Sequence, residues 1–233
     1  PDREGDNNVV DQIDYGTNLA GSEDGTITWG FWDFRTKVGP NANGESRGYF
    51  PFTDAQRAAA VISIRNWDEL ITTNFELVDV SEHDVGDWAH GDAPDILMAN
   101  TLTGPAQAWA YLPTEGGKGG WHRAAGDVWI GAAADNRTDL FDGGYGVTTQ
   151  VHELGHSLGL NHPGDYHFGD DTDGDGVPDP ITYDGDAFYW QDSRTYSIMS
   201  YFDTYDTGNN MVDYNILRVV YQATPMVHDM WVI

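Results

Sequence analysis

The sequence contains no cysteine, which excludes disulfides, thiolate metal sites and cysteine nucleophiles. Histidine and the carboxylates remain as the strong metal ligands. Basic residues are also scarce, with 11 Lys and Arg against 38 Asp and Glu, and the formal net charge is −27. Phosphate backbones would repel so acidic a chain, so we expect no nucleic-acid partner and an affinity for cations.

Long hydrophobic runs are missing as well. No apolar stretch approaches the ~20 residues that a membrane-spanning helix needs, and residues 1–11 lack the basic and apolar regions of a signal peptide. The chain does have 13% aromatic residues and 28 glycines among 233 residues, which is typical of a folded, loop-rich domain. We therefore expect a folded monomer without a membrane span.

Hydrophobic periodicity predicts two long helices and one sheet. Residues 53–71 carry apolar positions at helical spacing behind a capping box of Thr53 and Gln56. Residues 147–158 repeat that spacing and end where Gly159 can adopt a left-handed cap. Shorter β-branched or aromatic runs predict strands at residues 26–31, 75–80, 95–98, 106–112 and 127–130.

The pattern divides the chain into three stretches. Residues 1–24 are polar and are expected to form an N-terminal extension ahead of a core that begins at residue 26. Residues 25–160 carry the sheet and both helices, and residues 161–233 are rich in Asp and Gly and should be mostly loop. We predict one α+β domain overall, with an upper lobe over 25–160 and an irregular lower lobe over 161–233.

A metal-binding pattern lies on the second predicted helix. His152 and His156 are four residues apart, so their imidazoles share one face of the helix. Glu153 lies about 100° further round, where it suits a metal-activated water better than the metal itself. Gly159 lets the chain turn back so that His162 becomes a third ligand and the fourth tetrahedral position stays open. The spacing H-E-x-x-H-x-x-G-x-x-H is highly specific for catalytic zinc.

Other interpretations of these residues exist. A buried helix with satisfied histidines, a structural zinc site or an inactive relative would show the same three ligands. Retention of Glu153 argues against all three, because a structural site has no use for a general base. In the catalytic interpretation, Glu153 takes a proton from the zinc-activated water and later delivers it to the leaving amine.

The segment Ser197-Ile198-Met199-Ser200-Tyr201 extends the pattern. Together with the zinc motif it resembles the serralysins, secreted zinc endopeptidases of the metzincin clan, and the similarity runs from about residue 26 to the end. The resemblance implies a two-lobed metzincin fold with a mixed, mostly parallel twisted sheet. It also implies that Met199 forms an apolar floor beneath the histidines and that Tyr201 is catalytic, donating a hydrogen bond to the oxyanion of the reacting peptide.

The same resemblance implies further properties of the whole protein. The substrate would be extended polypeptide, paired with the edge strand predicted at residues 106–112. Calcium-binding RTX repeats would follow in a longer chain, since none occurs before Ile233. Type I export would place the protein outside the cell or at its surface. Two alternatives remain open: a calcium-binding surface module with structural zinc, and a protease restricted to its own precursor or to one surface protein.

An acidic loop follows the zinc motif. Its spacing matches the first half of an EF-hand calcium loop, with candidate ligands at Asp171, Asp173, Asp175 and Asp179. The departure is at the twelfth position, where Thr182 stands in place of a bidentate glutamate. We expect structural Ca²⁺ in addition to catalytic Zn²⁺, and a solvated acidic turn is the alternative.

Overall fold

The computed structural model describes residues 6–17, 19, 25–32, 45–80, 94–104, 106–113, 125–131 and 133–233. Its centre is a sheet with the strand order β3-β1-β4-β6-β5, and β2 pairs with β4 beside this path. The strands are β1 (Thr26–Phe31), β2 (Tyr49–Phe50), β3 (Asn74–Leu77), β4 (Ile96–Thr101), β5 (Ala108–Ala110) and β6 (Val128–Ile130).

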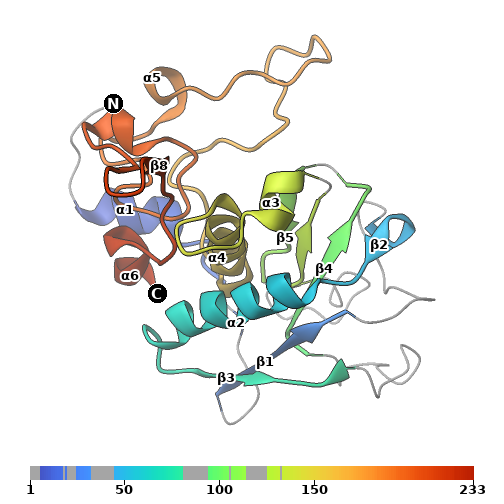
Figure 1. Ribbon diagram of the computed structural model, residues 1–233. Coiled ribbons are helices and arrows are strands. Elements are labelled where there is room, and N and C mark those ends of the chain that lie inside the picture. Colours follow the sequence, from blue (N-terminus) through green and yellow to red (C-terminus); the bar gives the residue numbers. More distant parts are fainter. Residues whose placement is uncertain are drawn as a thin grey trace.

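The sheet is mixed and mostly parallel. β3, β1, β4 and β6 run in the same direction, whereas β5 is antiparallel to β6 and β2 is antiparallel to β4. All six residues of β4 and all three of β6 are buried, as expected for parallel strands covered on both faces. The α+β fold with two longer helices, predicted from the sequence, is confirmed, and β5 ends the strand order and contacts helix α4 (Figure 1).

The two long helices are α2 (Asp54–Asp68) and α4 (Tyr145–Leu158), which pack against each other across the sheet face (Figure 1). The predicted capping box begins α2. The Thr53 hydroxyl accepts from the Gln56 backbone amide, and the Gln56 side-chain oxygen accepts from the Thr53 backbone amide. Trp67 is fully buried and its indole Nε1 donates to the Val151 carbonyl at 3.1 Å. This bond joins the two helices near the middle of α4.

Shorter elements surround this centre. They are the helices α1 (Asp6–Ile13), α3 (Ala134–Thr138), α5 (Tyr183–Asp186) and α6 (Val227–Val232), the 3-10 turns Glu45–Arg47 and Thr204–Thr207, and the hairpin of β7 (Val212–Asp213) and β8 (Arg218–Val219). None of them was predicted, because elements this short carry too few residues to show a period. Within the described ranges, no helix is both long and apolar enough to cross a membrane.

The N-terminal segment belongs to the core. Val9 and Ile13 of α1 are buried in the same cluster as Trp67, Leu154 and Ile198. The core therefore begins before residue 26, where the sequence pattern placed its start. Among residues 9–13 of this helix, whose burial the structure describes, two buried positions give too weak a periodic signal to be recognised among polar neighbours.

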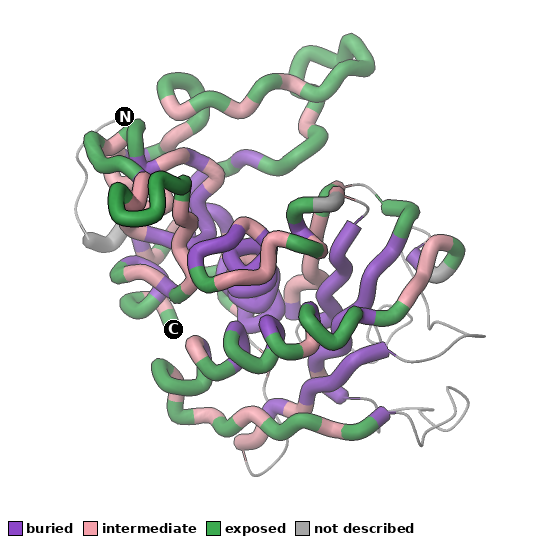
Figure 2. The backbone as a smooth tube through the Cα atoms, in the orientation of Figure 1, coloured by how far each residue is buried: buried purple, intermediate pink, exposed green. Residues whose placement is uncertain are grey.

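The chain after α4 is mostly irregular, as predicted, yet much of it is buried (Figure 2). Two stretches are mostly exposed: the segment from about residue 167 to α5, which extends from the body as a loop (Figure 1), and residues 205–219 around the β7–β8 hairpin. The last residues return to the centre, because α6 contacts α1 and the Thr148 hydroxyl in α4 donates to the Gln222 carbonyl at 2.7 Å.

Candidate active site

Helix α4 presents the first two histidines. Its apolar residues Val147, Val151, Leu154 and Leu158 are buried in the core, which turns His152 and His156 toward the opposite side. Gly159 ends the helix with φ 106°, the left-handed conformation that the sequence predicted.

The turn after α4 is fixed by the N-terminal segment. Asp14 and Leu160 form an antiparallel bridge, and the Asn161 amide donates to the Ile13 carbonyl at 2.6 Å. This pairing holds the chain directly before His162. Backbone hydrogen bonds to residues 13 and 14 therefore hold the turn that places His162 near His152 and His156.

The three histidines converge as predicted. One ring nitrogen from each of His152, His156 and His162 lies within 4.8 Å of the other two. The Nε2 atoms of His156 and His162 are 3.1 Å apart. Tetrahedral zinc with Zn–N bonds of ~2.0 to 2.1 Å would separate its nitrogen ligands by about 3.3 Å, so this spacing suits one shared ion.

Each ring is oriented by a backbone carbonyl behind it. Nδ1 of His152 bonds the Ile198 carbonyl at 2.8 Å, Nδ1 of His156 bonds Leu160 at 2.7 Å, and Nδ1 of His162 bonds Tyr166 at 3.0 Å. A carbonyl can only accept, so each Nδ1 carries the proton and each Nε2 keeps its lone pair. The Nε2 lone pairs of His156 and His162 then face each other, an arrangement that a shared cation would relieve.

Burial keeps these imidazoles neutral. It lowers the pKa of His152 to about 3 and that of His156 to about 4, and it holds the pKa of His162 well below the usual range. Neutral rings are the form that binds metal. Three nitrogen ligands with fixed tautomers fit zinc, and softer copper or iron–sulfur chemistry has no thiolate here to support it.

Glu153 lies beside the ligands and does not belong to the metal-compatible group. Its side chain is buried, and burial raises the pKa of Glu153 to about 8, partly offset by a hydrogen bond from the Ala110 backbone. The Oε2 atom is buried without a hydrogen-bond partner among the described residues. A buried carboxylate with one unsatisfied oxygen next to three metal ligands is positioned to hold a water or move a proton.

Met199 packs against α4. It is fully buried, and a Cβ added to Gly155 would lie 2.4 Å from its sulfur. The glycine of the motif thus provides the space that the methionine fills. A residue with a side chain at position 155 would push either Met199 or the helix that carries His156.

Two tyrosines pack against the third histidine. The ring centroid of Tyr201 lies 4.3 Å from that of His162, and Tyr166 stacks on the same imidazole at 5.5 Å. Burial and the nearby Glu153 carboxylate raise the pKa of Tyr201, so its phenol keeps its proton at neutral pH. It is a hydrogen-bond donor beside the metal-compatible group.

Two buried aspartates organise the segment around Met199. Asp229 of α6 accepts from the Ser197 hydroxyl at 2.6 Å and from the Ile198 amide at 2.8 Å. Asp192 accepts from the hydroxyls of Tyr166 and Ser200 at 3.0 and 2.7 Å. Burial raises the pKa of both carboxyls to about 6.

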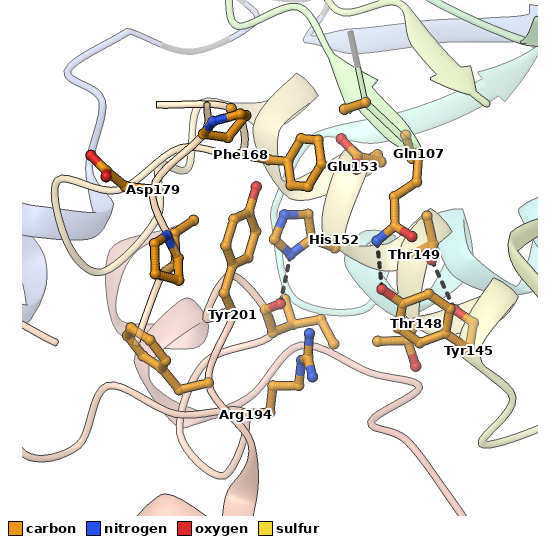
Figure 3. A pocket seen from close by; sticks show the side chains of 18 residues that line it. Gln107, Tyr145, Thr148, Thr149, His152, Glu153, Phe168, Asp179, Arg194 and Tyr201 are labelled. Atoms are coloured by element: carbon orange, nitrogen blue, oxygen red, sulfur yellow. Dashed lines mark hydrogen bonds between the residues drawn. The ribbon is translucent and has the colours of Figure 1, made fainter. Parts of the chain in front are cut away.

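A cavity of about 470 Å³ opens beside His152 and Glu153 (Figure 3). Its walls come from β5 and the residues before it, from the first half of α4, from the segment around Tyr201, and from the exposed loop at Phe168 and Pro178 to Ile181. Arg194 also lines this cavity. The cavity therefore connects the metal-compatible group with the edge strand and with the loop that the sequence marked as acidic.

The acidic loop forms a second group that could hold a metal. One carboxylate oxygen from each of Asp171, Asp173 and Asp175 lies within 4.8 Å of the others, and all three residues are exposed. Asp179 is not in this group. Its carboxylate accepts from the Thr172 amide at 2.7 Å and from the Thr172 hydroxyl. Thr182 caps α5 by accepting from the Gly185 amide.

Sequence reasoning missed several residues of the site. The carbonyls behind the histidines could not be identified, since any residue supplies a carbonyl. Asp192, Asp229 and Arg194 were also missed. Arg194 had a recognisable signal, because it follows directly on residues 163–193, which contain no Lys or Arg.

Comparisons with known proteins identify relatives of this arrangement. The Matrixin family of peptidases matches over residues 51–167, which include all three histidines and Glu153. A serralysin of Photorhabdus laumondii is 34% identical over 181 residues, covering 76% of this chain and 32% of that protein.

Two further relatives extend the match. The metalloprotease AprA of Pseudomonas entomophila is 32% identical over 210 residues, covering 89% of this chain and 38% of its own length. A serralysin of Proteus mirabilis is 32% identical over 207 residues, covering 87% of this chain and 38% of its own length. This chain thus spans about a third of the length of the relatives it matches.

Contact between Gly155 and Met199 yields a stability prediction. Gly155→Ala places a methyl group against a buried sulfur, and overpacking of this kind costs roughly 1 to 3 kcal/mol. We expect the loss to shrink in a Met199→Ala background, where space is available. Urea unfolding of the two single variants and the double variant measures this coupling, and strictly additive losses would contradict the contact.

Proposed function

Because this chain belongs to the Matrixin family of peptidases, we propose that it is a zinc-dependent endopeptidase that hydrolyses extended polypeptides. One observation carries the proposal. Three neutral imidazoles direct their Nε2 lone pairs at one point, and the unsatisfied Glu153 carboxylate lies beside them at a cavity. A purely structural zinc site needs four protein ligands and no adjacent base, and here three histidines converge at an open cavity.

Zinc held by His152, His156 and His162 would polarise the scissile carbonyl and lower the pKa of a water toward ~7. The protein supplies the remaining steps. Glu153 accepts the proton of the attacking water and transfers it to the amine that leaves. Burial alone raises the pKa of Glu153, and the positive charge of zinc beside it would favour the ionised form that accepts the proton.

The edge strand provides a binding surface for the substrate backbone. β5 is paired with β6 on one side, and on the other side Ala106, Gln107 and Ala108 line the cavity. An extended peptide that adds to this edge would bring its backbone past Glu153. The hydrogen bond from Ala110 to Glu153 links the same strand to the general base.

Tyr201 is proposed to stabilise the charge that develops on the scissile oxygen. Its raised pKa keeps the phenol protonated, and its ring lies against His162 at the cavity wall. A hydrogen-bond donor at this place stabilises the transition state more than the bound substrate, because the scissile oxygen becomes negative only in the transition state. Met199 would act only through packing, by supporting the helix that carries His156.

We further propose that the loop around Asp173 binds a structural calcium ion. Three clustered carboxylates repel one another without a cation, and Gly176 adopts φ 86° at the position where EF-hand loops turn sharply. Ordering by calcium would affect the cavity directly, because Pro178 to Ile181 of the same loop form part of its wall.

An extracellular location is proposed together with this activity. The acidic surplus and the absence of cysteine suit a protein that works outside the cell without disulfides. Since the aligned part covers only about a third of these relatives, further domains such as calcium-binding repeats are proposed for the whole protein.

Glu153→Gln tests the general base. The substitution keeps the shape of the side chain but removes its basicity, and we expect kcat for casein or a peptide substrate to fall by at least ~10²-fold. Metal analysis should still find one zinc per chain, because Glu153 is not a ligand. Activity at the wild-type level would refute the mechanism, and zinc binding without turnover in the wild type would favour a structural site.

Tyr201→Phe tests the oxyanion contact. Loss of the phenol donor is expected to lower kcat by about 10²-fold with a smaller change in KM, because the bond forms mainly in the transition state. Steady-state kinetics on one peptide measures both constants. Tyr205→Phe, which removes an exposed phenol, serves as the matched control, and equal effects of the two variants would argue against the role of Tyr201.

The calcium loop is tested by titration calorimetry. The wild type is expected to release or absorb heat on binding one calcium ion, and the variant Asp173→Ala, Asp175→Ala is expected to show only heat of dilution. Asp11→Ala, Glu76→Ala removes the same charge from exposed positions outside the loop and should titrate like the wild type. Identical heats for all three proteins would mean that the loop binds nothing.

A further inference from the structure

Arg194 is an unusual residue in this cavity. The chain carries a net charge of −27 with only 11 basic residues, yet one of them lines the cavity beside His152. It is the single Lys or Arg among the described residues of the cavity wall. An acidic protein tends to repel acidic substrates, so a cation at this place alters which side chains the cavity accepts.

The position of Arg194 is fixed on two sides. Its backbone amide donates to the Phe202 carbonyl at 3.0 Å, and its Nη1 donates to Asp203 at 2.8 Å. Figure 3 shows the guanidinium pointing into the space between His152 and Tyr145. Its positive charge also reaches Tyr201, where it partly opposes the increase in pKa that burial and Glu153 cause.

The guanidinium retains unused hydrogen-bonding capacity. It has five N–H donors, and its contact with Asp203 through Nη1 is its one side-chain hydrogen bond within the described parts of the chain. The side chain is only 16% exposed, whereas Asp203 is 49% exposed. The edge formed by Nε and Nη2 remains for a second carboxylate, which could bind it through two parallel hydrogen bonds.

We propose that Arg194 makes this cavity a subsite for an acidic side chain, so that the enzyme prefers substrates with Glu or Asp at one position next to the scissile bond. The inference rests on the proposed peptidase function and specifies its substrate class. An aliphatic side chain would leave the mostly buried guanidinium without its second acceptor. A basic side chain would be repelled by it.

The alternative is that Arg194 only holds the segment around Tyr201 through its pair with Asp203. A structural role of this kind would change the hydrolysis of all peptides equally. The ratio of two rates measured on one enzyme preparation separates the two roles, because this ratio does not depend on how much of the protein is folded.

The first measurement uses the wild-type protein loaded with zinc. Peptides that are identical except for Glu or Gln are compared at each of three positions on either side of the scissile bond. We expect kcat/KM to be about tenfold higher for Glu at one position, as for a charge-assisted hydrogen bond, and the preference to fall in 1 M salt. Ratios near one at every position would overturn the proposal.

The second measurement uses variants. Arg194→Gln should bring the Glu/Gln ratio to one or below, whereas Asp203→Asn should increase the ratio because it leaves the guanidinium entirely to the substrate. Arg65→Gln is the matched control, since it removes an exposed arginine that is also paired with a carboxylate, Glu69. Arg194→Lys keeps the charge without the planar fork, so an intermediate ratio is expected, and it replaces Arg194→Gln if that variant does not fold.

The outcomes separate this inference from the proposed function. A wild-type ratio that persists in Arg194→Gln would assign the preference to another residue and refute the role of Arg194. Hydrolysis of all peptides without discrimination would refute the subsite and leave the peptidase function intact. Failure of the zinc-loaded protein to hydrolyse any peptide would refute the peptidase function itself.

Discussion

Three hydrogen bonds from imidazole Nδ1 atoms to backbone carbonyls determine what this site can do. Each bond fixes a tautomer, and each fixed tautomer directs one lone pair at the common point. A histidine without such a partner could rotate or protonate the other nitrogen. The carbonyls come from the turn after α4, from Tyr166 and from Ile198, so the irregular second half of the chain is what gives the regular helix its metal chemistry.

These carbonyls are themselves held in place by separate parts of the molecule. Leu160 is paired with Asp14, Ile198 donates its amide to Asp229, and the phenol of Tyr166 bonds Asp192. Burying a carboxylate costs free energy unless several donors satisfy it, and both aspartates have at least two. The orientation of each ring therefore depends on a second layer of bonds, which explains why so many polar groups are buried around so small a site.

Much of the fold could be predicted from the sequence, since residues 26–31, α2 and α4 have clear periods and the capping box of Thr53 and Gln56 is a local signal. The metal-compatible histidines and Glu153 were predictable for the same reason, because three of these four residues lie on one helix. The contribution of Ile13, Asp192 and Asp229 was not predictable. Those residues reach the site through contacts between distant segments, and short irregular segments have no period that reveals which side chains they bury.

The bridge between Asp14 and Leu160 also bears on biosynthesis. It joins segments far apart in the sequence, and the bond from Ile198 to Asp229 requires the chain to be present as far as α6. Contacts of such long separation form late, because loop-closure entropy opposes them until the intervening chain is compact. A nascent chain that has emerged only through α4 carries the zinc motif without the carbonyls that orient it. The metal-compatible arrangement of the three histidines is therefore complete only after the chain has folded as far as α6.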